Sequence, residues 1–148
     1  MRKRTTTALR ERLGFSYMPA SHERLRIGFN AMSGRIIEAA GFPIMGLSGY
    51  SVSASLLGKP DVGLITLDEM VTTTRYITAA TSVPLLADGD TGYGNAINAM
   101  RTTQEFIRAG AAGMHIEDQV APKRCGHVAG KEIIPIEEAV GKYAACAH

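Results

Sequence analysis

Residues 83–95 read Val-Pro-Leu-Leu-Ala-Asp-Gly-Asp-Thr-Gly-Tyr-Gly-Asn, and this stretch decides how the chain folds. It begins with a short apolar run, which is typical of a buried β-strand. Asp88 and Asp90 stand two residues apart at the end of that run, so both side chains point to the same side of the strand. Glycines then form a turn, and a helical pattern starts at residue 95. The stretch therefore predicts a strand, a polar loop and a helix in succession.

The same alternation extends in both directions along the chain. Thr66 followed by Glu69 has the pattern of a capping box at a helix start, and Gly110 is a natural helix end. The expected strands are residues 42–47, 83–87 and 113–116, and the expected helices are residues 31–40, 66–80, 95–109 and 136–147. The expected apolar positions of the first and third helices are Met32, Ile36, Ile37, Ala40, Ile97, Met100, Phe106 and Ile107.

Alternating strands and helices predict an α/β fold with a parallel sheet. The connections from helix to strand are short, whereas those from strand to helix are longer and contain nearly all of the unusual residues. Parallel α/β folds place their chemistry at the carboxyl ends of the strands. We therefore expect the functional site at that edge of the sheet.

Composition and charge exclude several classes of protein. The chain of 148 residues is 45% hydrophobic and 20% charged, which suits one globular domain rather than a disordered chain. Its apolar runs are too short for a membrane span, and two distant cysteines do not form a disulfide scaffold. Residues 1–26 carry seven basic and two acidic residues, whereas residues 27–148 carry nine and twelve. A basic N-terminal helix on a mildly acidic body does not favour nucleic-acid binding, and we expect a cytoplasmic protein.

Acidic side chains cluster at the ends of the expected strands. Asp88 and Asp90 follow one strand, and His115 and Glu117 share one face at the end of the next. Carboxylates in this arrangement suit a hard cation such as Mg²⁺. The alternatives are structural: Asp90 caps the turn, Asp88 pairs with a lysine, and Glu117 forms an ion pair. The glycines at residues 92–94 do not complete a dinucleotide or phosphate-loop motif.

Residues 122–127, Pro-Lys-Arg-Cys-Gly-His, form the second unusual segment. Cationic neighbours favour the thiolate of Cys125 and so predict a reactive cysteine, and the adjacent glycines suggest a loop that closes over a ligand. The alternative is an exposed loop with an incidental cysteine. A zinc site that also uses Cys146 is disfavoured, because one residue between Cys and His is not the usual ligand spacing.

Taken together, these motifs resemble the isocitrate lyase and phosphoenolpyruvate mutase superfamily. The resemblance covers residues 28–145, and the segment at 123–127 is its most specific element. The motifs that occur in the order and spacing of that family are residues 48–50 (Ser-Gly-Tyr), Asp61, residues 88–90 (Asp-Gly-Asp), residues 117–119 (Glu-Asp-Gln) and residues 123–127 (Lys-Arg-Cys-Gly-His).

The resemblance implies a role for each matching position. Asp88 would ligate Mg²⁺ (or Mn²⁺) directly, while the waters of the metal would be held by Asp61, Asp90 and Glu117. Cys125 would act as general acid/base on a gating loop that is shaped by Lys123, Arg124, Gly126 and His127. The carboxylate and oxygen of a 2-oxo acid would be bound by Ser48, Gly49 and Tyr50, with Asp88 and His115 also at the substrate.

The resemblance further implies a carbon–carbon lyase that acts on a 2-hydroxy or 2-alkyl malate-like di- or tricarboxylic acid. The cysteine favours the lyase branch, which includes 2-methylisocitrate and 2,3-dimethylmalate lyases. Residues 49–58 are more similar to 2-alkylmalate and dimethylmalate lyases than to isocitrate lyase. Oxaloacetate decarboxylation or hydrolysis and phosphonate-forming mutases, such as carboxyvinyl-carboxyphosphonate phosphorylmutase, are the alternatives. The family also implies a homotetramer.

Two features depart from the family pattern. The first barrel strand is expected within residues 14–28, yet this stretch is largely polar and charged, so residues 1–27 are expected to be irregular or helical. Family members are (β/α)₈ TIM barrels of about 250 residues, whereas residues 1–148 provide about four β/α units of a single partial barrel. An inactive half-barrel is therefore an alternative to an active enzyme, because its open sheet edges favour association.

Overall fold

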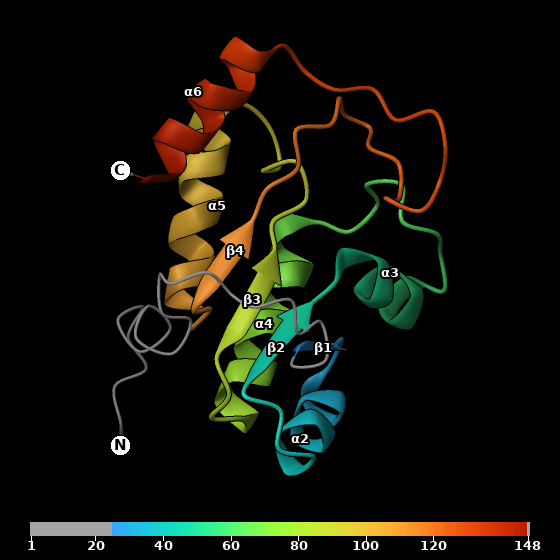
Figure 1. The fold of residues 1–148 in the computed structure, drawn as a ribbon, viewed down its shortest axis with the longest axis vertical. Coiled ribbons are helices and arrows are strands. Elements are labelled where there is room, and N and C mark those ends of the chain that lie inside the picture. Colours follow the sequence, from blue (N-terminus) through green and yellow to red (C-terminus); the bar gives the residue numbers. More distant parts are fainter. Residues whose placement is uncertain (1–24, 148) are drawn as a thin grey trace.

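The computed structural model describes residues 25–147, which form a parallel α/β fold (Figure 1). Four strands lie in the order β1-β2-β3-β4, and every neighbouring pair is parallel. This confirms the expected fold class and the β/α alternation. In chain order the elements are β1 (Leu25–Gly28), α2 (Ala31–Ala39), β2 (Ile44–Leu47), α3 (Gly49–Leu57), α4 (Leu67–Ala80), β3 (Leu85–Asp88), α5 (Ala96–Arg108), β4 (Gly113–His115) and α6 (Ile136–Ala147).

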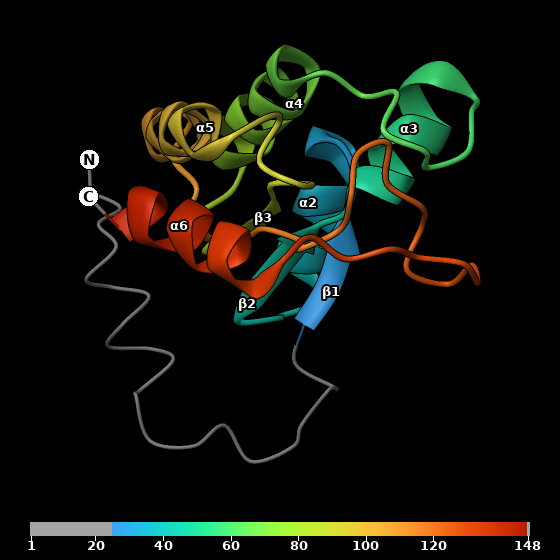
Figure 2. The same cartoon turned by 90° about the horizontal axis from the view of Figure 1, so that it is seen from above.

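The strand register places the carboxyl ends of β3 and β4 side by side, since Asp88 pairs with His115. β2 is buried at all four positions because strands flank it on both sides. Viewed from above, α4 and α5 lie together on one side of the strands, and α6 lies next to α5 (Figure 2). The side chains at the centre of this core are Met45, Leu47, Met70, Ile77, Leu85 and Phe106.

The helix starts follow the sequence. The Thr66 hydroxyl accepts a hydrogen bond from the Glu69 amide, and the Glu69 carboxylate accepts one of 2.8 Å from the Thr66 amide. This capping box was predicted and is confirmed. A reciprocal Asn95–Asn98 pair caps α5 in the same way, so that the loop after β3 ends at a fixed point.

The first strand corrects one prediction. Residues 25–28 (Leu-Arg-Ile-Gly) form β1 and pair with β2, although the polar character of residues 14–28 suggested that this strand was lost. Strand pairing overrides the weak local signal, because β2 offers a complete ladder of backbone partners. The N-terminal helix expected before this point lies outside the described residues.

The predicted apolar faces of two helices were wrong in part, since Phe106 and Ile37 are buried as expected and other members are exposed. In α5, Ile97 and Ile107 are 75% and 57% exposed, while Ala99, Thr102 and Phe106 are buried. The small residues face inward because α5 packs directly on the preceding loop, where the Thr102 hydroxyl donates a hydrogen bond of 3.1 Å to the Gly92 carbonyl. In α2, Met32 and Ile36 are likewise exposed, and Ile37 alone of the expected apolar set is buried.

Residues 49–57 form α3, a helix that is not among those expected from the sequence. The segment is rich in serine, which weakens a helical pattern. Its end is set by Gly58, which takes the left-handed conformation at φ 62°. Within residues 25–147, no helix has the length and apolar character needed to cross a membrane.

Candidate functional site

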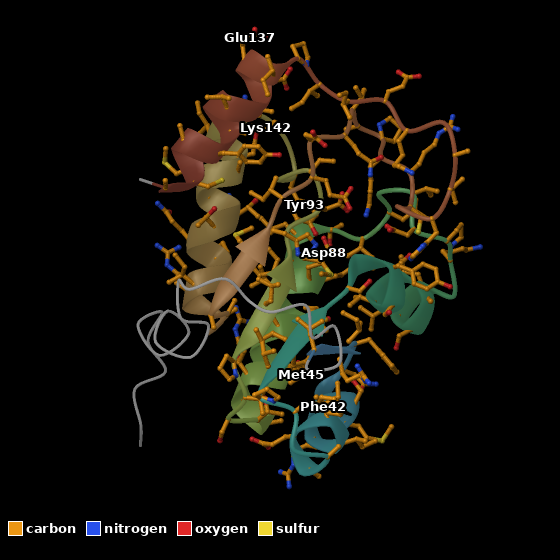
Figure 3. All side chains as sticks on the ribbon, viewed as in Figure 1. Phe42, Met45, Asp88, Tyr93, Glu137 and Lys142 are labelled. Carbon is orange, nitrogen blue, oxygen red and sulfur yellow. The ribbon has the colours of Figure 1, made fainter. Side chains whose placement is uncertain are left out.

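The predicted site residues converge at the carboxyl edge of the sheet. Asp88 is the last residue of β3, and Tyr93 lies close to it in the loop that leads to α5 (Figure 3). The loop after β4 and the segment around Lys123 meet the same edge, because Lys123 reaches carboxylates from three different loops. The topology thus brings together residues that are up to 62 positions apart.

Asp88 is a buried carboxylate with three donors. It accepts hydrogen bonds from the Gly49 amide at 2.7 Å and the Asp90 amide at 3.0 Å, and His115 Nε2 lies 3.2 Å away. Burial by itself would raise the pKa of Asp88, but these donors outweigh it and lower the pKa to about 2. The hydrogen bond to Asp88 raises the pKa of His115, against the effect of its own partial burial. Asp88 is therefore ionised at neutral pH.

Asp90 has the opposite electrostatic character. It adopts a left-handed conformation at φ 50°, and its carboxylate accepts a hydrogen bond of 2.9 Å from the Thr91 amide. Its carbonyl accepts one of 2.7 Å from the Glu117 amide, which joins the loops after β3 and β4. Burial raises the pKa of Asp90 to about 6, although the positive charge of Lys123 opposes the rise. A nearby positive charge therefore favours the ionised form of this carboxylate.

Lys123 supplies that positive charge in the described structure. Its ammonium lies 2.9 Å from an Asp61 carboxylate oxygen, 3.7 Å from Glu117 and 3.8 Å from Asp90, and its side chain is 2% exposed. Burial would lower the pKa of Lys123, but the hydrogen bond to Asp61 and the surrounding carboxylates raise it. The sequence predicted that Lys123 shapes a gating loop. The structure places its ammonium among the carboxylates of Asp61, Asp90 and Glu117, which together with Asp88 and Lys123 itself we call the acidic cluster.

The donor chemistry of this cluster fits a divalent cation. Asp61, Asp88, Asp90 and Glu117 provide hard carboxylate oxygens, the ligands that Mg²⁺ prefers, and the single ammonium of Lys123 lies within 3.8 Å of three of them. Among residues 25–147, no group of three or more His, Cys, Asp or Glu side chains is already arranged to hold a metal. The Lys123 ammonium instead occupies the position between the carboxylates.

Gln119 is a functional candidate that sequence reasoning quoted only as part of a motif. It is 7% exposed. Its amide nitrogen donates hydrogen bonds to the Glu117 carboxylate at 2.7 Å and to the Arg124 carbonyl at 3.0 Å, while its amide oxygen accepts one from the Arg124 amide. Gln119 therefore fixes the start of the cysteine segment to the acidic cluster. Its place in Glu-Asp-Gln, beside a predicted ligand, was the available signal.

Backbone carbonyls in and next to the cysteine segment accept hydrogen bonds that fix its shape. Cys125 is a partly buried free thiol, and its carbonyl accepts a hydrogen bond of 2.9 Å from the Val128 amide. Lys131 donates to the carbonyls of Gly126 and Val128, at 3.0 and 2.8 Å. Arg124 and His127 are both exposed. The segment is thus a defined turn two residues beyond the buried Lys123.

Of the segment predicted to bind a carboxylate, the structure brings only Gly49 into contact with Asp88. A side chain there would be crowded, since a Cβ atom would lie 3.1 Å from the Asp88 carboxylate. Ser48 is the N-cap of α3, and its hydroxyl makes no cap hydrogen bond. Tyr50 is 52% exposed. The Gly49 amide therefore holds the Asp88 carboxylate at the start of α3, next to Ser48.

Comparison with known proteins gives a consistent result. The family model described as phosphoenolpyruvate phosphomutase matches residues 20–148. A 2,3-dimethylmalate lyase of Eubacterium barkeri is 46% identical over 141 residues, which is 93% of this chain and 46% of that protein. A 2-methylisocitrate lyase of Escherichia coli (strain K12) is 48% identical over 114 residues, which is 76% of this chain and 38% of that protein.

Solved structures agree on the fold. A phosphoenolpyruvate phosphomutase from Streptomyces platensis subsp. rosaceus has a TM-score of 0.88 at 33% identity, covering 97% of this chain and 48% of that one. An oxaloacetate acetylhydrolase in complex with 3,3-difluorooxalacetate has a TM-score of 0.80 at 35% identity, covering 84% and 43%. A phosphonopyruvate hydrolase in complex with oxalate and Mg²⁺ has a TM-score of 0.75 at 33% identity, covering 83% and 41%.

The chain thus spans less than half the length of the relatives and structures it matches. Its four parallel β/α units are the half-barrel that the resemblance implied. The match of the family model over residues 20–148, together with the relatives named as lyases, identifies the chain as a member of the phosphoenolpyruvate phosphomutase family, within the isocitrate lyase superfamily.

Proposed function

We propose that this protein is a Mg²⁺-dependent carbon–carbon lyase that cleaves a 2-hydroxy or 2-alkyl malate-like acid. The observation that carries the proposal is the buried cluster in which Asp61, Asp90 and Glu117 surround the Lys123 ammonium. Such a concentration of buried charge is costly unless it serves a ligand. The names of two relatives, 2,3-dimethylmalate lyase and 2-methylisocitrate lyase, support this substrate class.

Asp61, Asp88, Asp90 and Glu117 are the residues that would hold the metal. The phosphonopyruvate hydrolase whose structure contains oxalate and Mg²⁺ supports this choice of ion, and Mn²⁺ has the same ligand preference. When bound, the ion supplies positive charge at the oxygens on which negative charge develops. Asp88 is suited to this task because its low pKa keeps it ionised throughout the physiological range.

The substrate acid would lie against the start of α3. The Ser48 hydroxyl makes no cap hydrogen bond, so it could donate to a carboxylate or to the oxygen beside it. The Gly49 amide already donates to Asp88 and therefore holds that carboxylate in place. His115, which is half exposed beside Asp88, offers a second donor to the acid on the neighbouring strand.

Cys125 would manage the proton at that departing carbon. Cleavage of a 2-hydroxy acid converts the C2 hydroxyl to a carbonyl, with its proton passing to solvent water, and the electron pair of the C2–C3 bond goes to C3. The thiol of Cys125 then donates a proton to C3 as general acid. Gln119 positions this segment through Arg124, and Lys123 anchors it in the acidic cluster.

The test is turnover of 2,3-dimethylmalate, which this cleavage divides into pyruvate and propionate. We expect pyruvate release that needs Mg²⁺ or Mn²⁺ and stops with EDTA. Cys125→Ser should lower the rate by about 10²-fold or more, the usual contribution of a positioned acid or base. Cys146→Ser is the matched control, because Cys146 is the other free thiol and lies on α6. Equal loss in both variants, or none in either, contradicts the role of Cys125.

Hydrolysis of oxaloacetate is the second candidate. The oxaloacetate acetylhydrolase structure, at 35% identity, supports it, since a metal held by the same carboxylates could bind a 2-oxo acid. Release of oxalate and acetate from oxaloacetate, at a rate above that of 2,3-dimethylmalate, would select this reaction instead. For either activity we expect a cytoplasmic enzyme that forms a homotetramer. Sedimentation of the purified protein would test the homotetramer.

A further inference from the structure

Buried charge in the described part of the chain is almost confined to the site. Among residues 25–147, the charged residues that are less than 9% exposed are Asp61, Asp88, Asp90, Lys123 and Lys142. Four of the five belong to the acidic cluster. Lys142 is 6% exposed, comes from α6, and has no part in the mechanism above. Figure 3 shows it on α6, facing the loop that contains Tyr93.

The contacts of Lys142 do not compensate for its burial through an ordinary ion pair. Its ammonium donates a hydrogen bond of 3.3 Å to the Thr91 carbonyl, while the Glu138 carboxylate lies 3.9 Å away with its side chain 52% exposed. A buried ammonium is costly unless it is well paired. An apolar side chain of similar length would fill the same space at lower cost. The role of Lys142 therefore lies in the group that it holds, the Thr91 carbonyl.

Thr91 belongs to a loop whose backbone is strained. Asp90 and Tyr93 are the non-glycine residues with positive φ among residues 25–147, at 50° and 57°. Non-glycine residues seldom adopt such conformations, which persist where the surroundings enforce them. The Thr91 amide holds the Asp90 carboxylate, and the Glu117 amide holds the Asp90 carbonyl. Lys142 adds a bond at the next carbonyl along the chain.

We propose that Lys142 is a positioning residue, which acts from α6 to hold the strained Asp90 loop in the geometry that presents the Asp90 carboxylate to the acidic cluster. In consequence the docking of α6 and the geometry of the site are coupled. Tyr143 strengthens this coupling, because its hydroxyl lies 3.5 Å from the Ile116 carbonyl in the loop after β4. The part of the inference that concerns metal affinity rests on the proposed function; the part that concerns the loop does not.

A positioning role and a purely electrostatic role make opposite predictions. If Lys142 acted only as a nearby positive charge, its removal would tighten the binding of a divalent cation. If Lys142 holds the loop, its removal lets Asp90 leave its strained conformation and weakens binding. Lys142→Met keeps the length of the side chain and removes the charge and the donors. Lys142→Arg keeps the charge and the hydrogen-bond donors. Glu138→Gln removes the charge of the exposed partner and leaves the Thr91 contact in place.

The first measurement is amide hydrogen exchange of the metal-free full chain. In Lys142→Met we expect exchange in residues 88–94 to rise by about tenfold, the factor expected for a local opening that costs about 1.4 kcal/mol less. Exchange in β2 should stay unchanged. Lys142→Arg and Glu138→Gln should behave as the wild type. An unchanged loop in Lys142→Met, or a uniform rise in all segments, overturns the proposal.

A wild-type measurement keeps the proposal falsifiable if Lys142→Met fails to fold. The ammonium protons of Lys142 should exchange slowly in ¹⁵N NMR spectra, because they are buried against the Thr91 carbonyl. Lys59, which is exposed, provides the comparison in the same sample. Equal exchange rates at the two lysines would contradict the bond on which the inference depends.

The second measurement is titration with Mn²⁺ alone. We expect Lys142→Met to bind Mn²⁺ about tenfold more weakly than the wild type, with Lys142→Arg and Glu138→Gln unchanged. Equal or tighter binding by Lys142→Met overturns the coupling of Lys142 to the site. A wild-type chain that binds no Mn²⁺ overturns the metal site of the proposed function, and hydrogen exchange still decides whether Lys142 holds the loop.

Discussion

At the scale of single residues, Asp90 is the clearest case of a proposed site residue that lowers the stability of the protein. It is a buried carboxylate in a left-handed backbone conformation, next to the ionised Asp88. Each of these features costs free energy in the metal-free protein. Lys123 relieves part of the cost with a single ammonium that Asp90 shares with Asp61 and Glu117. The site is therefore built to gain from additional positive charge.

Asp90→Asn should stabilise the metal-free protein at neutral pH. Asparagine keeps the oxygen that accepts from the Thr91 amide, tolerates the left-handed conformation, and removes the buried charge. We expect the free energy of unfolding at pH 7 to rise by about 1–3 kcal/mol, because the pKa of Asp90 rises from 3.8 to about 6 on folding. The wild type therefore loses stability as the pH increases from the unfolded pKa toward and through the folded one.

Urea unfolding between pH 4 and pH 8 measures this effect. The difference between Asp90→Asn and the wild type should be small near pH 4 and should open as the pH rises through about 6. A difference that is constant across the range, or a variant that is less stable at pH 7, would contradict the raised pKa.

Gly89 and Gly141 form a matched pair of glycines. A Cβ atom at Gly89 would lie 2.8 Å from the His115 carbonyl oxygen, the acceptor of the Gly89 amide, whereas a Cβ atom at Gly141 in α6 meets nothing within 4 Å. We expect Gly89→Ala to lower the free energy of unfolding by about 2 kcal/mol. Gly141→Ala should raise it by about 0.5–1 kcal/mol. Thermal unfolding of both variants checks the pair, and equal shifts in the same direction would refute it.

The positions of some residues could be predicted from the sequence, and those of others could not. The spacing of Asp88 and Asp90 was sufficient to place both at a strand end, because strand periodicity is a local property. The position of the Lys123 ammonium was not, since it depends on how three loops meet in space. Gln119 and Lys142 were not assigned to the site for the same reason: their partners are contacts of the folded chain.

At the scale of elements, helix starts were predictable and helix faces were not. The Thr66–Glu69 capping box is encoded within four residues and is present in the structure. The inward face of α5 depends instead on the loop beneath it, which selects Ala99 and Thr102 over the larger Ile97. β1 was missed because it is only four residues long, follows a polar stretch, and is defined by its pairing with β2 in the assembled sheet.

The α4 cap yields a prediction about pH. Hydrogen bonds from the Thr66 amide and hydroxyl lower the pKa of Glu69, so its stabilising contribution is present above the pKa of the unfolded chain and is lost as the pH falls through the folded value. Thr66→Ala should cost about 1 kcal/mol at pH 7, and less at pH 3. Glu105→Gln, which removes a partly exposed carboxylate of α5 that is distant in sequence from this cap, is the control. A cost for Thr66→Ala that is independent of pH would show that Glu69 does not contribute through its charge.

At the scale of the whole molecule, four parallel β/α units collect the acidic residues at one edge of the sheet. Asp61 follows α3, Asp88 and Asp90 follow β3, and Glu117 follows β4. The order of the sheet brings these segments together, and Lys142 of α6 closes the group by holding the Asp90 loop. These described units thus contain the carboxylates, the cysteine segment and the Gly49 amide that the proposed reaction needs.

Titration of the wild-type chain with Mn²⁺, followed by electron paramagnetic resonance, tests the metal site most directly. We expect one saturable Mn²⁺ site per chain that Mg²⁺ displaces, and at least about tenfold weaker binding in Asp88→Asn, which removes the carboxylate held by Gly49 and His115. Asp68→Asn, an exposed carboxylate in the first turn of α4, should bind as the wild type does. A wild-type chain without saturable binding, or an Asp88→Asn variant that binds Mn²⁺ equally well, would contradict a divalent-cation site at the carboxyl edge of the sheet.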